Sequence, residues 1–272
     1  MNLLTDAHAA AATVLEAAQL TREDPNRSGS VLTFGAAGQL VMTGDMHGHL
    51  RNFEKLQRFC DLARSPGRSV ILHELIHCEP DPVSGLDLSI DLLLRAAAWK
   101  CEYPDNVYFL QSNHELSQWR AHEITKGGRS VLADFARGVA HRFGRDAERV
   151  LEAVEDYTAA LPLAARTARG LLLTHSLPDA GALPHFDYGV LERAPTAEDC
   201  EPGGAAYELV WGRFQTPEEI DEIAARLGVS AFIVGHTPQE SGCAVIGRMI
   251  ILASDHAHGV FLPIDLSQTP DV

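Results

Sequence analysis

The sequence contains no uninterrupted apolar run of about 18 or more residues, so it offers no candidate for a membrane-spanning helix. The first 20 residues are rich in alanine but lack the basic start of a secretory signal, and Asp6, His8 and Glu16 interrupt them. We therefore expect an amphipathic N-terminal helix and a cytoplasmic protein with no membrane partner.

Paired cysteines and positive charge are also scarce. The five cysteines form no C-x-x-C pair, which argues against a disulfide framework and a thiolate zinc site. The 22 Lys and Arg residues face 37 Asp and Glu residues, giving a net charge of −15. Such a chain repels polynucleotides and anionic lipid, so neither is an expected partner. A phosphate ester would need positive charge from another source, and bound cations are the simplest one.

The apolar content, 46% of 272 residues, is enough for a sizeable core. We predict a single α/β domain over residues 1–272, with an N-terminal helix of about residues 1–22 packed on it. Short apolar runs predict strands at 69–72, 107–110, 161–165, 170–173 and 231–234. Residues 31–35 and 39–42 are interpreted as a hairpin, and 243–246, 249–253 and 260–264 as antiparallel strands. Helices are expected over 50–62, 86–99 and 217–227, two more within 129–160, and a long loop over 178–204.

The most informative stretch is Gly44-Asp45-Met46-His47-Gly48-His49, between a strand and a helix. Glycine lets the loop turn and lets its backbone approach a ligand, while Asp45 and His47 alternate along an extended segment and can point the same way. A carboxylate and an imidazole suit a divalent metal, and the free N–H groups of the next helix suit an anion such as phosphate.

The same pattern recurs, because an apolar strand repeatedly runs into a loop that carries metal-competent side chains. It occurs at Asp45/His47, Glu74/His77, Asn113/His114, His175 and His236. Open α/β sheets build their sites at the carboxyl ends of strands, so these side chains are expected to converge.

These motifs, with Ala160 to Ala165 and Glu208 to Trp211 around them, resemble the calcineurin-like metallophosphoesterases over roughly residues 39–266. Within them the chain is most similar to the phosphoprotein phosphatase branch, which also contains bacterial diadenosine tetraphosphate hydrolases. The resemblance implies a two-sheet β-sandwich flanked by helices and a phosphomonoesterase acting on a phosphoprotein or a small phosphoester. A nucleotide-polyphosphate hydrolase of the same fold is the alternative.

The resemblance also implies roles for individual residues. Asp45 and His47 would bind one metal ion, Asn113, His175 and His236 a second, and Glu74 would bridge the two, which could be Mn, Fe or Zn. His114 would be the general acid. Here the family motif G-D-x-x-D-R-G reads His73-Glu74-Leu75-Ile76-His77-Cys78-Glu79, so His77 replaces the Asp that orients His114 and Cys78 replaces a phosphate-binding Arg. Candidates for the lost phosphate contact are Arg213 and Arg120, with His256 or His258 at the rim.

Two other functions remain open on the sequence. The segment from His73 to His77 also matches H-E-x-x-H, in which two histidines on one helical face bind zinc and the glutamate is the base of a protease. That interpretation requires a helix through residues 73–77. A third hypothesis is a binding module inactivated by the changes at His77 and Cys78. The three differ in expected metal content: two ions, one zinc and none.

Overall fold

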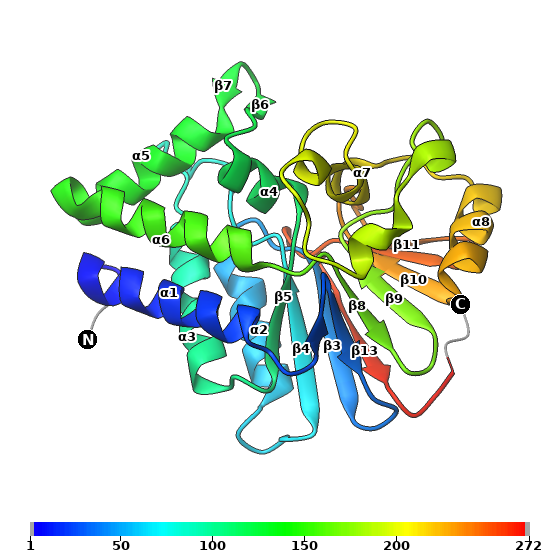
Figure 1. Ribbon diagram of the computed structural model, residues 1–272. Coiled ribbons are helices and arrows are strands. Elements are labelled where there is room, and N and C mark those ends of the chain that lie inside the picture. Colours follow the sequence, from blue (N-terminus) through cyan, green and yellow to red (C-terminus); the bar gives the residue numbers. More distant parts are fainter. Residues whose placement is uncertain (1–2, 270–272) are drawn as a thin grey trace.

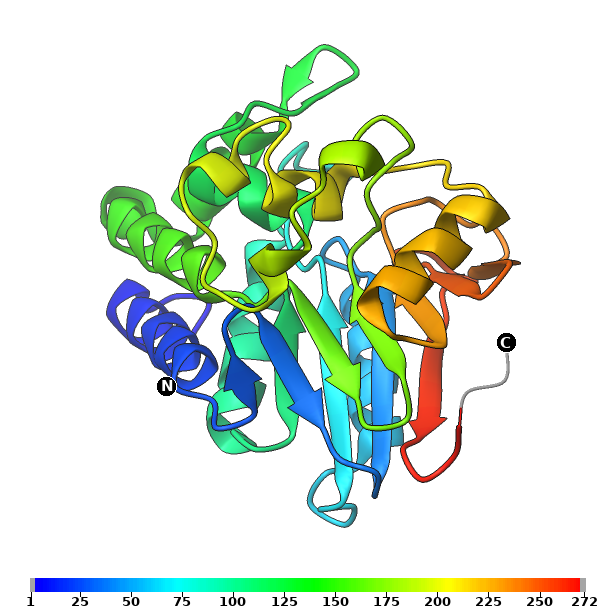
Figure 2. The ribbon, with the colours of Figure 1, turned by 45° about the vertical axis from the view of Figure 1, so that its right-hand side comes forward.

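The computed structural model describes residues 3–269 as two packed β-sheets with helices on both outer faces (Figure 1). The four-stranded sheet has the order β13 (Phe261–Asp265), β3 (Gln39–Asp45), β4 (Arg68–His73), β5 (Val107–Leu110). The seven-stranded sheet has the order β1 (Arg27–Ser28), β2 (Val31–Phe34), β8 (Ala164–Thr167), β9 (Leu171–Thr174), β10 (Ala231–Val234), β12 (Met249–Leu252), β11 (Cys243–Ile246). The two-sheet sandwich flanked by helices is therefore confirmed (Figure 2).

Strands buried on both faces explain the continuous apolar runs in the sequence. Met42 and Ile71 point into the core between the two sheets, where they meet Leu173 and Ile233. Their chain neighbours, such as Val41, point to the opposite face and into a second core under helices. Each central strand thus holds the two layers on its two sides together.

Helices cover both outer faces. Over the four-stranded sheet they are α1 (Ala7–Arg22), α2 (Leu50–Cys60), α3 (Ile90–Glu102), α5 (Val131–Phe143) and α6 (Ala147–Ala160). Over the seven-stranded sheet they are α7 (Ala205–Trp211) and α8 (Pro217–Leu227). The N-terminal helix α1 lies along α6, where Arg22 forms an ion pair with Asp156 at 2.6 Å. Within residues 3–269, no helix has the length and apolarity needed to cross a bilayer.

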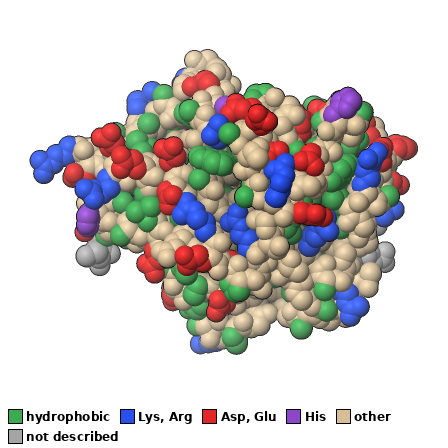
Figure 3. Space-filling view, viewed as in Figure 1, with side chains coloured by type: hydrophobic (Ala, Val, Ile, Leu, Met, Phe, Trp, Pro, Cys, Tyr) green, Lys and Arg blue, Asp and Glu red, His purple; other side chains and the backbone are tan. Residues whose placement is uncertain are grey.

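Short connecting elements complete the chain. Helix α4 (Asn113–Arg120) follows β5 directly, and a small hairpin of β6 (Thr125–Lys126) and β7 (Arg129–Ser130) projects beyond it (Figure 1). Residues 178–204 form the predicted long loop, which contains 3-10 turns at Leu183–His185, Tyr188–Leu191 and Glu198–Cys200. On the face shown in Figure 3, acidic and basic side chains are interspersed, and no continuous basic surface is visible there.

Two predicted pairings are wrong. β2 and β3 form no hairpin, because β2 pairs with β8 in one sheet and β3 pairs with β4 in the other. The predicted antiparallel pairing of 243–246 with 249–253 is confirmed as β11 with β12, but β13 does not continue that sheet and instead pairs antiparallel with β3. In both cases a short connection crosses between the sheets: residues 35–38 lead from β2 to β3, and residues 253–260 lead from β12 to β13. The predicted helix at 86–99 also begins later, at Ile90.

Candidate metal centre

Five strand ends bring their side chains to one edge of the sandwich. Strands β3, β4 and β5 are parallel to one another in one sheet, and β9 and β10 are parallel in the other, so these ends meet where the sheets adjoin. The side chains delivered there are Asp45 and His47 after β3, Glu74 after β4, Asn113 and His114 after β5, His175 after β9 and His236 after β10. The structure therefore brings together residues up to 191 positions apart, as the hydrogen bond between His236 and Asp45 shows.

The first group of donor atoms, which we call the enclosed set, consists of Glu74, Asn113, His175 and His236. The Nε2 atom of His175 lies 2.6 Å from Asn113 Oδ1, 3.0 Å from His236 Nδ1 and 3.3 Å from Glu74 Oε2. Asn113 Oδ1 is also 3.0 Å from His236 Nδ1. All four residues are buried. Their lone pairs therefore converge on one small volume.

The second group, the open set, consists of His47, Glu74 and His114. Glu74 Oε1 lies 3.7 Å from His47 Nε2 and 3.4 Å from His114 Nε2. The His47 side chain is 17% exposed, against 1% for Glu74. Glu74 thus offers one carboxylate oxygen to each set, and only the open set reaches solvent.

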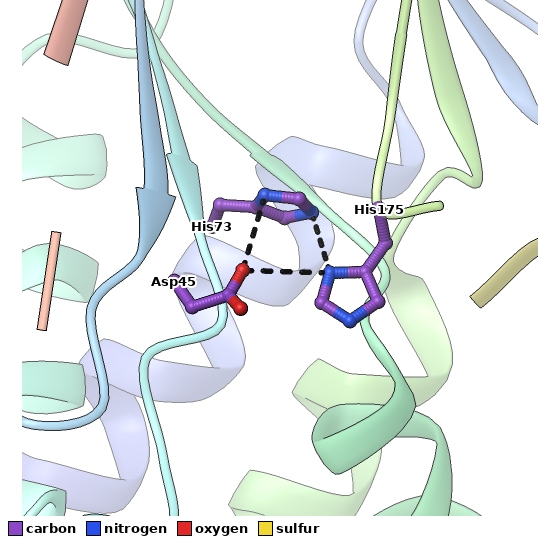
Figure 4. A group of neighbouring side chains, drawn as sticks. All are labelled: Asp45, His73 and His175. Carbon is purple, nitrogen blue, oxygen red and sulfur yellow. Dashed lines mark hydrogen bonds and ion pairs between the residues drawn. The ribbon is translucent and has the colours of Figure 1, made fainter. Parts of the chain in front are cut away.

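Asp45 lies beside the enclosed set rather than beside His47 in its shortest contacts. Its Oδ1 is 3.7 Å from His175 Nδ1 and 3.9 Å from His73 Nδ1 (Figure 4). The backbone N–H of His236 donates to Oδ2 at 2.8 Å. The carboxyl groups of Asp45 and Glu74 are near enough to influence each other's pKa, so Asp45 also lies close to the residue that the two sets share.

The backbone around the donors is held in unusual conformations. His47, Glu74, His77 and His236 have φ values of 39°, 45°, 65° and 66°, and they are four of the seven non-glycine residues with positive φ among those described. Such residues are uncommon outside functional sites, because the surrounding structure must pay the strain. Gly235 is needed for a different reason: a Cβ there would lie 2.2 Å from Asp45 Oδ1.

Burial dominates the electrostatics of the site. It raises the pKa of Asp45 to about 7 and, with the nearby Asp45 charge, raises the pKa of Glu74 well above its ordinary value. Burial also lowers the pKa of each imidazole in the two sets, to about 3 for His236. Burial therefore disfavours charge on all of these groups: the histidines are neutral, and both carboxyl groups are shifted toward their protonated form.

His114 is held by a second histidine. His77 Nε2 lies 3.0 Å from Gln118 Oε1, which can only accept, so this nitrogen carries the His77 proton. His77 Nδ1 then accepts from the Nδ1–H of His114 at 2.9 Å. This arrangement leaves His114 Nε2 free to face Glu74. It also fixes both rings, because neutral imidazole has only one N–H to place.

A cavity of about 610 Å³ opens beside the open set. Its lining includes His47, Gly48, His77, Cys78, Glu79, Asp81, Asp91, Lys126 and Asp255. Among the described residues of this lining, Lys126 is the only Lys or Arg. Cys78 brings no charge, since burial raises the pKa of its thiol to about 12 and the thiol donates to Asp87 at 3.1 Å.

The remaining sequence candidates lie in different places. Arg213 reaches the site, with Nη2 3.4 Å from His236 Nδ1. Arg120 instead pairs with Glu201 at 2.9 Å and is absent from the cavity lining, so its position gives no support to the expected phosphate contact. His256 contacts the carbonyl oxygen of Gln239 at 2.8 Å, and His258 is exposed. Neither side chain lines the cavity.

The sequence analysis did not predict three residues of the candidate site: His73, Gln118 and Lys126. Gln118 carried a signal, because it lies four residues after His114 on the same helix face. His73 was considered only as part of the H-E-x-x-H pattern. Lys126 sits in a two-residue strand with no apolar periodicity, so no pattern pointed to it.

The H-E-x-x-H interpretation fails on backbone geometry. His73 ends strand β4, and residues 74–77 form a loop in which Glu74 and His77 have left-handed φ values. The two histidines therefore do not share a helix face. His77 contacts His114, whereas His73 contacts His175 at 3.1 Å. The helix that the zinc-protease alternative requires is therefore not formed by residues 73–77.

The donor chemistry fits divalent cations. Glu74 Oε2 is buried and accepts no hydrogen bond from any residue within 3–269. Asn113 Oδ1, His175 Nε2 and His236 Nδ1 point at the same place as this oxygen. Acceptor atoms gain little by facing one another in a buried site, so this arrangement fits a bound cation. The groups His47/Glu74/His114 and Asp45/His73/His175 also have the spacing of metal ligands. Mixed imidazole, carboxylate and amide donors suit Mn, Fe and Zn alike.

Comparison with known proteins agrees with this fold. No family model matches the sequence, and no curated protein matches it either. Among solved structures, the chain is similar to a serine/threonine phosphatase from Saccharomyces cerevisiae with similarity to human PP5, at a TM-score of 0.69 and 15% identity, covering 92% of this chain and 78% of that one. It is also similar to a cold-active protein-tyrosine phosphatase of a Shewanella species, at a TM-score of 0.57 and 13% identity, covering 92% and 80%. The fold is that of the calcineurin-like phosphoesterases.

Proposed function

We propose that this chain is a dinuclear metal-dependent phosphoesterase that hydrolyses phosphomonoesters. The observation that carries the proposal is the sharing of Glu74 between two donor sets, one enclosed and one open to a cavity. A mononuclear site or an inert binding module would not need two sets joined by one carboxylate. The phosphatase-type fold adds support at the level of architecture.

In this proposal Asn113, His175 and His236 would hold one cation, Asp45 and His47 would hold the other, and Glu74 would be shared by the two positions. Bound together, two such cations supply Lewis-acid polarisation of phosphoryl oxygens and lower the pKa of a water toward 7. The raised pKa values of Asp45 and Glu74 are consistent with a site for cations, because both carboxyl groups would ionise fully when cations bind.

His114 acts as the general acid that protonates the leaving oxygen from Nε2. Its Nδ1–H donates to neutral His77, and this hydrogen bond keeps the ring in place. The neutral ring has no proton on Nε2, so His114 would first take one there from solvent and then give it to the leaving oxygen. Gln118 fixes His77 as the acceptor. An aspartate at position 77 would add negative charge beside the imidazolium, whereas His77 offers only a lone pair, so His114 is expected to be a stronger acid here.

Lys126 supplies the positive charge that Cys78 cannot, and Arg213 supplies a second cation on the His236 side. Both would contact phosphate oxygens. The cavity also carries Glu79, Asp81 and Asp255, which would repel a substrate with several further phosphate groups. This acidic lining favours a phosphomonoester over a nucleotide polyphosphate.

The test measures metal content and hydrolysis together. Purified protein should bind two Mn, Fe or Zn ions per chain and hydrolyse p-nitrophenyl phosphate. Replacing Asp45, Asn113 or His236 by alanine should lower the rate by on the order of a hundredfold or more. If all three variants keep the full rate, the proposal is wrong. Thr21→Val, which removes a buried hydroxyl in α1, is the control for general destabilisation.

The role of His114 has a test of its own. A good leaving group such as p-nitrophenolate needs little protonation, whereas an alkoxide needs much. His114→Gln should therefore slow hydrolysis of an alkyl phosphate about a hundredfold and that of p-nitrophenyl phosphate far less. Equal losses on both substrates would show that His114 does not act as the acid.

A further inference from the structure

His73 is fully buried beside two of the proposed metal ligands. It ends strand β4, its side chain is 0% exposed, and it forms a triangle with Asp45 and His175 (Figure 4). The phosphoesterase motif that this segment resembles has glycine at this position, so the resemblance assigns the side chain no role. A buried polar side chain at the centre of a site requires an explanation from its own contacts.

The first contact concerns the proton of His175. This ring turns its Nε2 toward Asn113 Oδ1, at 2.6 Å, and toward the rest of the enclosed set. An imidazole that offers Nε2 to a cation carries its proton on Nδ1. That Nδ1 lies 3.1 Å from His73 Nε2, which is within hydrogen-bonding distance. His73 is therefore the acceptor that fixes the tautomer of His175.

The second contact follows from the first. Because Nε2 of His73 accepts, its proton lies on Nδ1. This atom is buried, has no hydrogen-bond partner among the described residues, and faces Asp45 Oδ1 at 3.9 Å. The His73 and His175 rings are nearly perpendicular, with centroids 4.7 Å apart. One side chain thus links a ligand from each of the two proposed metal positions.

The surroundings argue against a direct part in the reaction. Gly235 covers the Nδ1 side of His73, since a Cβ there would lie 3.1 Å from Nδ1. His73 is not part of the cavity lining. Substrate therefore has no path to this ring, although the ring touches residues that would touch the metals.

We propose that His73 is a positioning residue that presents His175 Nε2 to a metal ion and directs its own N–H toward Asp45. The inference depends on the proposed metal centre and adds to it a residue that acts through His175. Asp45, His73 and His175 are close enough together to hold an ion, but with Nε2 accepting and Nδ1 protonated His73 has no lone pair left for one. Histidine ligands usually donate their second N–H to a carboxylate or carbonyl, and losing such a partner costs about 10–100-fold in metal affinity. Here an imidazole takes that place.

Three variants separate the two nitrogens of His73. Glutamine places its amide oxygen near the position of Nε2 and can still accept from His175. Asparagine places its amide near Nδ1 and keeps only the side toward Asp45. Leucine removes both. The readout is the affinity of the metal-free protein for Mn and Zn by calorimetry, with the unfolding temperature of the metal-free variants as a check on folding.

We expect His73→Leu and His73→Asn to bind one of the two metal ions about 10–100-fold more weakly, and His73→Gln to stay within about threefold of the original chain. Thr21→Val should bind both ions unchanged. If Leu is inseparable from the original chain, His73 is only a core residue and the proposal is wrong. If Gln is as weak as Leu, acceptance by Nε2 is not the cause, and the proposal is equally wrong.

Two checks keep the outcomes distinct. Should His73→Leu not fold, the comparison of Gln with Asn decides, because both retain a polar side chain. If the original chain binds no metal, the proposed function and this inference fall together. If it binds two ions and hydrolyses phosphomonoesters while the variants do not differ, only the role of His73 is refuted.

Discussion

The enclosed and the open set share Glu74 but differ in almost every other respect. The enclosed donors lie 2.6–3.3 Å from His175 Nε2 and are buried, whereas the open donors lie 3.4–3.7 Å from Glu74 Oε1 and include the partly exposed His47. The enclosed set has a supporting ring, His73, behind it, and the open set borders the cavity. Under the proposed function, this difference implies two roles: the enclosed set would anchor one cation, and the open set would place the other where substrate can reach it.

The largest effect is expected from replacing Glu74, the residue common to both sets. Glu74→Gln should lower metal content at both positions and reduce hydrolysis by on the order of a thousandfold, because electrostatic stabilisation at one oxyanion is already worth about a hundred to a thousandfold. Metal analysis and steady-state rates measure this. Glu152→Gln, an exposed glutamate on α6, is the matched control and should change nothing. Loss of only one metal ion would mean that Glu74 serves a single position.

The next effect separates the sets. His175→Ala and His47→Ala should each leave about one metal ion per chain, but with different release behaviour. In the original chain, a chelator should remove metal in two phases, the faster one from the open set. His47→Ala should retain only the slow phase and His175→Ala only the fast one. A single phase in the original chain would contradict the distinction between an enclosed and an open position.

Proton competition provides a third comparison. Because burial raises the pKa of Asp45 to about 7, cations must displace its proton at lower pH, and affinity should rise by up to about tenfold per pH unit below 7 before levelling off. His236, with a pKa lowered to about 3, is already deprotonated across this range. Metal titrations from about pH 5.5 to 8 test this. Affinity that does not change below pH 7 would contradict the raised carboxylate pKa.

The raised pKa of Asp45 also affects the stability of the metal-free protein. A carboxyl whose folded pKa lies above its ordinary value stabilises the fold fully only below pH about 4, and that contribution is lost as pH rises through about 7. The buried neutral histidines act in the opposite sense, since their contribution is lost as pH falls below about 6.5. The gain in unfolding temperature on adding metal should therefore be larger at about pH 7.5 than at about pH 6.

The smallest effect is expected at the mouth of the cavity. Lys126→Met should raise the KM for a phosphomonoester about fivefold with little change in kcat, because an exposed charge contact is worth about 1 kcal/mol or less. Lys55→Met, at another exposed lysine outside this lining, is the matched control. An unchanged KM in the Lys126 variant would show that phosphate is held by other groups.

Individual residues show how much of the candidate site can be predicted from the sequence. Asp45, Asn113, His175 and His236 were found because each follows an apolar strand, and parallel strands end at the same edge of a sheet. The sheet to which each strand belongs could not be predicted, since the local pattern of β2 or β3 carries no information about a distant partner strand.

His73 and Lys126 show the other limit. His73 lies in the strand register like any buried residue, and only the three-dimensional contact with His175 gives it a role. Lys126 reaches the cavity from the small β6–β7 hairpin, which lies between α4 and α5 in the chain. Their positions depend on tertiary packing, which no short window of sequence specifies.

The buried carboxylate of Glu115 has a consequence for how this centre can change. It accepts the backbone N–H of Leu75 at 2.7 Å, one residue after Glu74, while its own helix begins with Asn113 and His114. The loop after β4 and the start of α4 are thereby tied together. Variation in either segment would displace donors on both sides at once, so selection has little freedom to retune one cation without disturbing its neighbour.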